Sequence, residues 1–84
     1  MFKTMANNFG LGKFFDKYGY NVLEMSYSDY VSNIDLVTSF VDASDDLKMI
    51  AIDDFGDEVL YQDFMDEATI VVYSKKVWEE NGLI

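Results

Sequence analysis

The stretch from residue 42 to residue 67 constrains the fold of this chain more than any other. It reads DASDDLKMIAIDDFGDEVLYQDFMDE, so short apolar runs alternate with acidic groups and Lys48 is the only basic residue. Short apolar runs bounded by Asp and Gly are typical of β-strands joined by turns. The stretch therefore predicts strands over 47–52 and 58–62, joined by an acidic turn over 53–57.

The remaining segments add helices and further strands. Apolar residues three to four positions apart indicate a helix, whereas alternating or β-branched runs indicate a strand. By these criteria the sequence predicts helices over about 11–18 and 28–41, strands over 20–26 and 68–73, and a turn over 63–67.

Two of these predictions concern helix ends. The helix over 28–41 is the clearest, with Ser28 or Asp29 as its N-cap. Residues 74–84 fit either a final helix that begins after Ser74 or an extension of the preceding strand, and the sequence leaves both open.

Taken together, the order of elements predicts one compact domain over residues 1–84. Its fold class is α+β, with a small antiparallel β-meander of three to four strands and two or three helices packed on one face. An unpaired strand at 68–73 would allow a second copy to pair with it, so both a monomer and a homodimer are expected possibilities.

The composition excludes several classes of function. The chain has no Cys, His, Arg or Pro and only six Lys. It therefore lacks the commonest general base, the bidentate phosphate fork and any thiolate ligand, so we expect no enzyme, no cofactor and no direct nucleic-acid binding. An EF-hand with Gly56 at its sixth position would begin at Ala51, which has no ligand oxygen, so we also predict no dedicated metal site.

The apolar runs are short. No stretch is long enough to span a membrane, and the first residues show no apolar run behind a basic region. We therefore expect no membrane association and a cytoplasmic protein, in a host cell if a phage encodes it.

The acidic charge is unevenly placed. The net charge is −10, yet residues 29–67 carry twelve acids and one lysine, a net −11. Such a surface would bind a partner with a basic groove. The candidate partner-binding acids are Asp29, Asp35, Asp42, Asp45, Asp46, Asp53, Asp54, Asp57, Glu58, Asp63, Asp66 and Glu67.

Two aromatic residues, Phe55 and Phe64, lie in the acidic turns. They either fold back to cap the sheet, which is the interpretation that we favour, or remain exposed as anchors for a partner protein.

In size, acidity and lack of catalytic groups, the chain is similar to small phage- or plasmid-encoded inhibitors, among them anti-restriction and anti-CRISPR proteins. Many of these are nucleic-acid mimics. The similarity is compositional and assigns no residue. It implies an acidic inhibitor that occupies the basic nucleic-acid-binding site of a host enzyme. The alternative is a non-enzymatic interaction module or assembly subunit that uses exposed aromatics, with the acids only for solubility.

Overall fold

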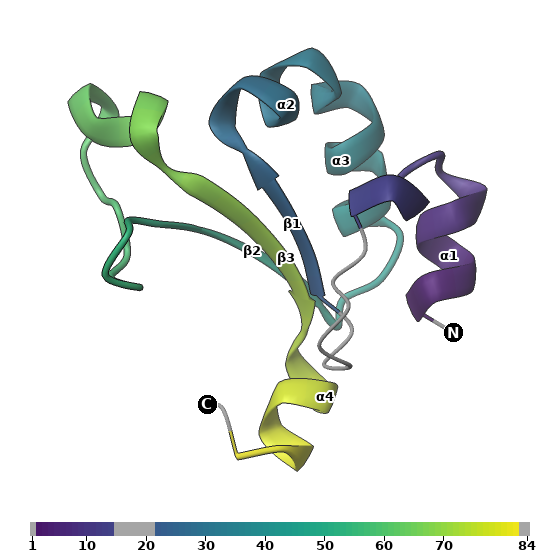
Figure 1. Ribbon diagram of the computed structural model, residues 1–84. Coiled ribbons are helices and arrows are strands. Elements are labelled where there is room, and N and C mark those ends of the chain that lie inside the picture. Colours follow the sequence, from purple (N-terminus) through teal and green to yellow (C-terminus); the bar gives the residue numbers. More distant parts are fainter. Residues whose placement is uncertain (1, 15–21, 83–84) are drawn as a thin grey trace.

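The computed structural model describes residues 2–14 and 22–82, which form a three-stranded sheet with helices packed alongside (Figure 1). The predicted α+β class is confirmed. In chain order the elements are α1 (Phe2–Asn8), the 3₁₀ helix η1 (Gly12–Phe14), β1 (Val22–Ser26), α2 (Tyr27–Ser32), α3 (Ile34–Asp42), β2 (Leu47–Ile52), the 3₁₀ helix η2 (Gln62–Glu67), β3 (Thr69–Ser74) and α4 (Lys75–Glu80).

The sheet has the order β1-β3-β2, and both outer strands run antiparallel to β3. The central strand, TIVVYS, buries Ile70, Val71 and Val72 in succession, as expected for the most β-branched run of the chain. The prediction that this strand lies at an edge, free to pair with a second copy, is wrong, because β1 and β2 occupy its two sides.

The predicted strand over 58–62 is absent. Glu58 makes one isolated bridge to Ile52, and the amide of Val59 donates to the carbonyl oxygen of Ala51 at 2.8 Å. The chain then turns into η2. The alternating sequence did indicate extended backbone, but β2 and β3 pair directly, so this segment meets only the outer edge of β2. The third strand is β1 instead.

The core lies between one face of the sheet and the helices α1 to α3 (Figure 1). Phe40 of α3 is fully buried, and its ring lies 5.6 Å from that of Phe9. The buried cluster consists of Ala6, Leu11, Leu23, Met25, Val37, Phe40, Leu47, Ile70 and Val72.

The predicted helix over 28–41 is two helices, α2 and α3, which break at Asn33. The Asn33 side chain donates to the carbonyl oxygen of Asp29 at 2.8 Å, and its backbone leaves the helical region at φ −124°. Asn competes in this way with the regular helix ladder. The N-cap is Ser26, whose hydroxyl accepts from the Asp29 amide at 3.1 Å, so the prediction of Ser28 or Asp29 was wrong by two or three residues.

The N-terminal helix begins earlier than predicted. Residues 2–8 form α1. Gly10, with a positive φ of 77°, follows the helix and terminates it. The amides of Gly10 and Leu11 donate to the carbonyl oxygens of Asn7 and Ala6 respectively, which is the Schellman pattern of a helix C-terminus. Of the predicted helix over 11–18, η1 covers residues 12–14, and the part beyond residue 14 lies outside the described residues.

The open question at the C-terminus is settled in favour of a helix. Ser74 accepts from the amide of Val77 at 3.3 Å and so caps α4. Trp78 of α4 stacks on Tyr73 of β3, with ring centroids 4.2 Å apart. This contact holds α4 against the end of the sheet.

Candidate protein-binding surface

The connection from β2 to β3 carries seven of the sixteen acids of the sequence. We call residues 53–67 the acidic connection: it holds seven acids and no lysine. Because Ile52 pairs with Thr69, the connection starts and ends at the same end of the sheet, where it protrudes (Figure 1). Its acids are Asp53, Asp54, Asp57, Glu58, Asp63, Asp66 and Glu67.

A local hydrogen-bond network shapes the first part of this connection. The Asp53 carboxylate accepts from the amides of Phe55 and Asp57, both at 2.9 Å. Gly56, with φ of 82°, takes the left-handed conformation that the turn needs. The Asp53 amide also donates to the Asp57 carbonyl oxygen at 2.9 Å. The turn predicted over 53–57 is thus confirmed, and Asp53 is a structural residue within the acidic connection.

Four large apolar side chains of the same connection face solvent. Phe55 is 90% exposed, Leu60 73%, Tyr61 71% and Phe64 62%. The interpretation that Phe55 and Phe64 fold back to cap the sheet is therefore wrong. The helices α1 to α3 already cover the core face of the sheet (Figure 1), and neither phenylalanine belongs to the core cluster or to the side chains packed against it. Leu60 and Tyr61, which were expected in a strand, lie between β2 and η2 and are exposed as well.

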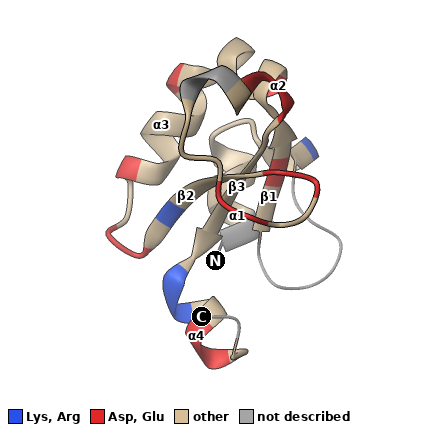
Figure 2. Ribbon diagram, turned by 90° about the vertical axis from the view of Figure 1, so that its left-hand side faces the viewer, with Lys and Arg blue, Asp and Glu red and all other residues tan. Residues whose placement is uncertain are grey.

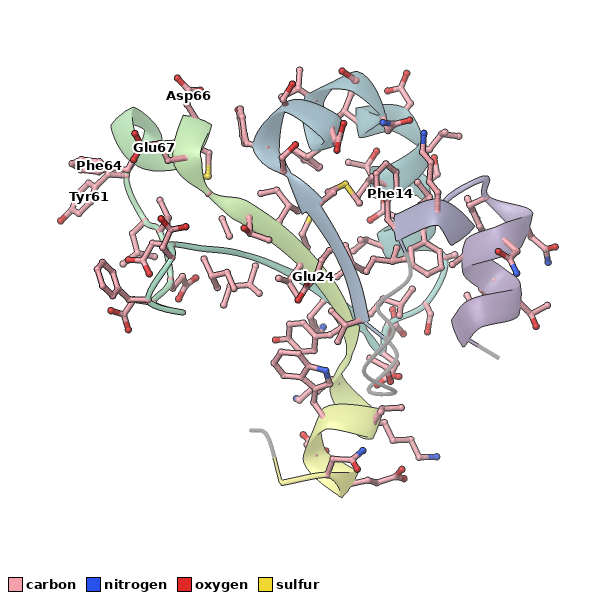
Figure 3. The ribbon with its side chains drawn as sticks, in the orientation of Figure 1. Phe14, Glu24, Tyr61, Phe64, Asp66 and Glu67 are labelled. Carbon is pink, nitrogen blue, oxygen red and sulfur yellow. The ribbon has the colours of Figure 1, made fainter. Side chains whose placement is uncertain are left out.

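These side chains line a hollow of about 280 Å³. Tyr61 and Phe64 project to the same side of the connection, and Glu67 lies near them on η2, whereas Asp66 points the other way (Figure 3). The hollow therefore combines aromatic walls with carboxylates. Its lining residues are Asp53, Asp54, Phe55, Val59, Leu60, Tyr61, Phe64 and Glu67.

A second hollow, of about 340 Å³, lies on the other side of η2 and is lined by apolar and Tyr side chains alone. Its lining includes Tyr27 and Tyr30 of α2 and Met65 of η2. Met49, which is 41% exposed, belongs to its floor on β2. Phe64 and Met65, which are neighbours in η2, thus line different hollows.

The predicted acids at the opposite end of the sheet have a different environment. Asp42 and Asp45 share a shallow groove with Lys48 at the start of β2. Lys75 and Lys76 lie at this end too, because Leu47 pairs with Ser74. Figure 2 shows these blue segments near α4, away from the red segments of the acidic connection.

Asp46, also at this end, is a structural residue. Its carboxylate accepts from the Ser74 hydroxyl and, at 2.8 Å, from the Lys76 amide. The hydrogen bond from Ser74, then that from the Lys76 amide, lowers the pKa of Asp46, and the positive charges of Lys76 and Lys48 act in the same direction. No local sequence pattern indicates this contact, which joins residues 28 positions apart.

The last predicted acids lie on helices or in η2. Asp29 and Asp35 are exposed in the first turns of α2 and α3, where they face the positive helix ends. Asp29 lies at the acidic end of the sheet, because α2 follows directly from β1 where Ser26 pairs with Thr69. The Asp63 side chain lies outside the described part of the structure. The predicted single acidic face is thus divided between the two ends of the sheet.

Metal ligation and membrane insertion have no candidate in the described ranges. Among residues 2–14 and 22–82, no three acidic side chains converge on a point where a metal ion would sit. Over the same residues, no helix has the length and apolarity to cross a bilayer.

Comparisons with known proteins add no relative. No protein-family model matches the sequence, and neither curated proteins nor solved structures include one with significant similarity. The function must therefore be argued from the surface itself.

Among the described residues, no lysine pairs with a carboxylate of the acidic connection. The one ion pair among the described residues joins Lys75 to Glu79 at 3.9 Å, at the far end. β2 has six residues and is about 20 Å long at roughly 3.3 Å per residue. This exceeds the screening length of about 8 Å at physiological salt, so the lysines of the far end do not neutralise the acidic connection.

Proposed function

We propose that this protein is a non-enzymatic inhibitor that inserts its acidic connection into the basic nucleic-acid-binding groove of a partner protein. The observation that carries the proposal is the placement of seven acids, with no lysine, at one end of the sheet. The number of charges is comparable to the roughly 6–10 phosphates that a DNA-binding protein commonly contacts. Such a surface competes with nucleic acid for the same lysines and arginines.

The turn around Asp53 favours this role because it orders the backbone that carries Asp54 and Asp57. Its hydrogen bonds engage backbone amides, and the side chains of Asp54, Asp57 and Glu67 remain exposed. A preorganised charged surface loses less conformational entropy on binding than a flexible acidic tail. Complementary charge also accelerates the encounter with a basic partner.

Capture from a bacterial lysate with two matched variants tests the proposal. Asp54→Asn/Asp57→Asn/Glu67→Gln removes three charges from the acidic connection and spares Asp53. The control variant removes three charges from the far end of the sheet, through the substitutions Asp42→Asn, Asp45→Asn and Glu80→Gln.

We expect wild type and control to capture the same proteins at low salt, and the first variant to lose them. Added duplex DNA and rising salt should both release the captured proteins, because the contact is electrostatic and shares the nucleic-acid site. Captured proteins that DNA does not displace, or that both variants retain equally, would refute the mimic.

The exposed apolar side chains support a second candidate, an interaction module in which the aromatic side chains supply most of the affinity. Leu60, Tyr61 and Phe64 are 73%, 71% and 62% exposed within one short connection. A group of exposed apolar side chains is typical of protein-interaction sites and is not needed for solubility. In this case Phe55→Ala/Tyr61→Ala abolishes capture, whereas the triple charge variant retains it and salt has little effect.

A further inference from the structure

The hollow in the acidic connection has the chemistry of a site for one cationic side chain. Tyr61 and Phe64 provide aromatic surface, and Glu67 and Asp54 provide carboxylates at its border. Its volume of about 280 Å³ lies just below the range of about 300–1,000 Å³ that is usual for small-molecule pockets. The hollow therefore suits a single side chain better than a cofactor or a metabolite.

The occupant must satisfy both parts of this lining. An aliphatic side chain would leave the carboxylates unpaired, and an anion would be repelled by them. A cation over an aromatic face is attracted by the negative face of the ring, and a neighbouring carboxylate adds a charge-assisted hydrogen bond. No lysine is among the lining residues, so no cation of the described chain occupies the hollow.

Arginine fits these requirements better than lysine. Its guanidinium is planar, stacks on aromatic rings, is weakly hydrated and offers donors along its edge to a carboxylate. Lysine has a strongly hydrated point charge and does not stack. We propose that this hollow binds the guanidinium group of an arginine side chain from a partner protein, stacked against Tyr61 or Phe64 and paired with Glu67.

The inference rests on the proposed function only for the source of the arginine, a basic partner groove. It adds an anchor: one arginine of the partner enters the hollow, while the surrounding carboxylates face other basic residues. Aromatic and arginine pairs of this kind carry much of the binding energy in protein interfaces.

A titration with short peptides tests the site without any partner. The probe is acetyl-Gly-Arg-Gly-amide, followed through the ring resonances of Tyr61 and Phe64 by NMR. Acetyl-Gly-Lys-Gly-amide has the same charge and controls for general attraction to an acidic protein. The citrulline peptide is nearly isosteric with the arginine peptide but neutral.

We expect the arginine peptide to shift the ring resonances of Tyr61 and Phe64 and to bind about fivefold more tightly than either control peptide. Tyr61→Ala and Glu67→Gln should each weaken arginine binding, whereas Asp42→Asn, a matched loss of charge at the far end, should leave it unchanged. All three residues are exposed, so the variants are expected to fold.

Equal binding of the lysine or citrulline peptide would overturn the assignment, as would resonance shifts spread evenly over the molecule. Such a result leaves the capture experiment unaffected, because an acidic mimic can bind a basic groove without an arginine anchor. Conversely, arginine binding in the absence of DNA-displaceable capture would refute the proposed function and retain the site.

Discussion

The same substitution to alanine should have very different effects on stability at two phenylalanines. Phe40 is fully buried, and Phe55 is 90% exposed. A phenylalanine side chain buries on the order of 200 Å² at most, and burial stabilises by about 25 cal/mol per Å². Phe55→Ala therefore costs about 0.5 kcal/mol. Phe40→Ala costs about 3–5 kcal/mol, which agrees with measured Phe-to-Ala losses in cores.

The difference is large relative to the total stability of a domain of this size. An 84-residue chain has an expected unfolding free energy of about 4–13 kcal/mol, at roughly 0.05–0.15 kcal/mol per residue. Phe40→Ala removes a large share of that, and Phe55→Ala hardly any. Urea unfolding measures both losses, with the single tryptophan, Trp78, as the fluorescent probe through its stacking on Tyr73.

We expect the urea midpoint of Phe55→Ala to stay close to that of wild type, and that of Phe40→Ala to fall by one molar or more, given slopes of about 1–3 kcal/mol per molar. If Phe55→Ala lowers the midpoint as much as Phe40→Ala, then Phe55 belongs to the core. Phe55 would then not be available to contact a partner.

Two further predictions concern helix ends. Gly10→Ala should lower the unfolding free energy by about 1–2 kcal/mol, because φ is 77° and no neighbouring atom compensates the strain; urea midpoints measure this loss. Asp46→Asn should destabilise the protein at pH 7, with Asp45→Asn as the neutral control. Since folding lowers the pKa of Asp46, its stabilising effect is present at neutral pH and is lost as pH falls below about 4, so urea midpoints of wild type and Asp46→Asn should converge in acid.

The fold class could be predicted from the sequence because apolar spacing and β-branched runs are local signals of helices and strands. The strand over 47–52 has the predicted bounds. Ser74 caps a helix, which was one of the two predicted structures for residues 74–84. The order of the strands could not be predicted. Alternation in residues 58–62 indicates an extended backbone. Whether that backbone pairs with β3 depends on which other strands already pair with both edges of β3. That information is spread over the whole chain.

The same limit applies to the surface. The concentration of acids in the acidic connection could be read directly, because charge is local. The exposure of Phe55 and Phe64 could not, since an aromatic residue in a turn is compatible with both a buried and an exposed position. The separation of Asp42, Asp45 and Asp46 from the other acids also required the structure, because β2 places adjacent acidic segments at opposite ends of the sheet.

The division between the two ends of the sheet bears on how one small domain supports both folding and binding. The core depends on α3 and the sheet, whereas the acidic connection is held by backbone hydrogen bonds such as that from Val59 to Ala51. Apart from the Asp53 carboxylate, which holds the turn, those of its acidic side chains that the structure describes are exposed, and their like charges oppose folding. An exposed acidic and aromatic segment of this kind fits the proposed role in a complex. Substitutions there should consequently change partner binding far more than the urea midpoint, and substitutions in the core should do the reverse.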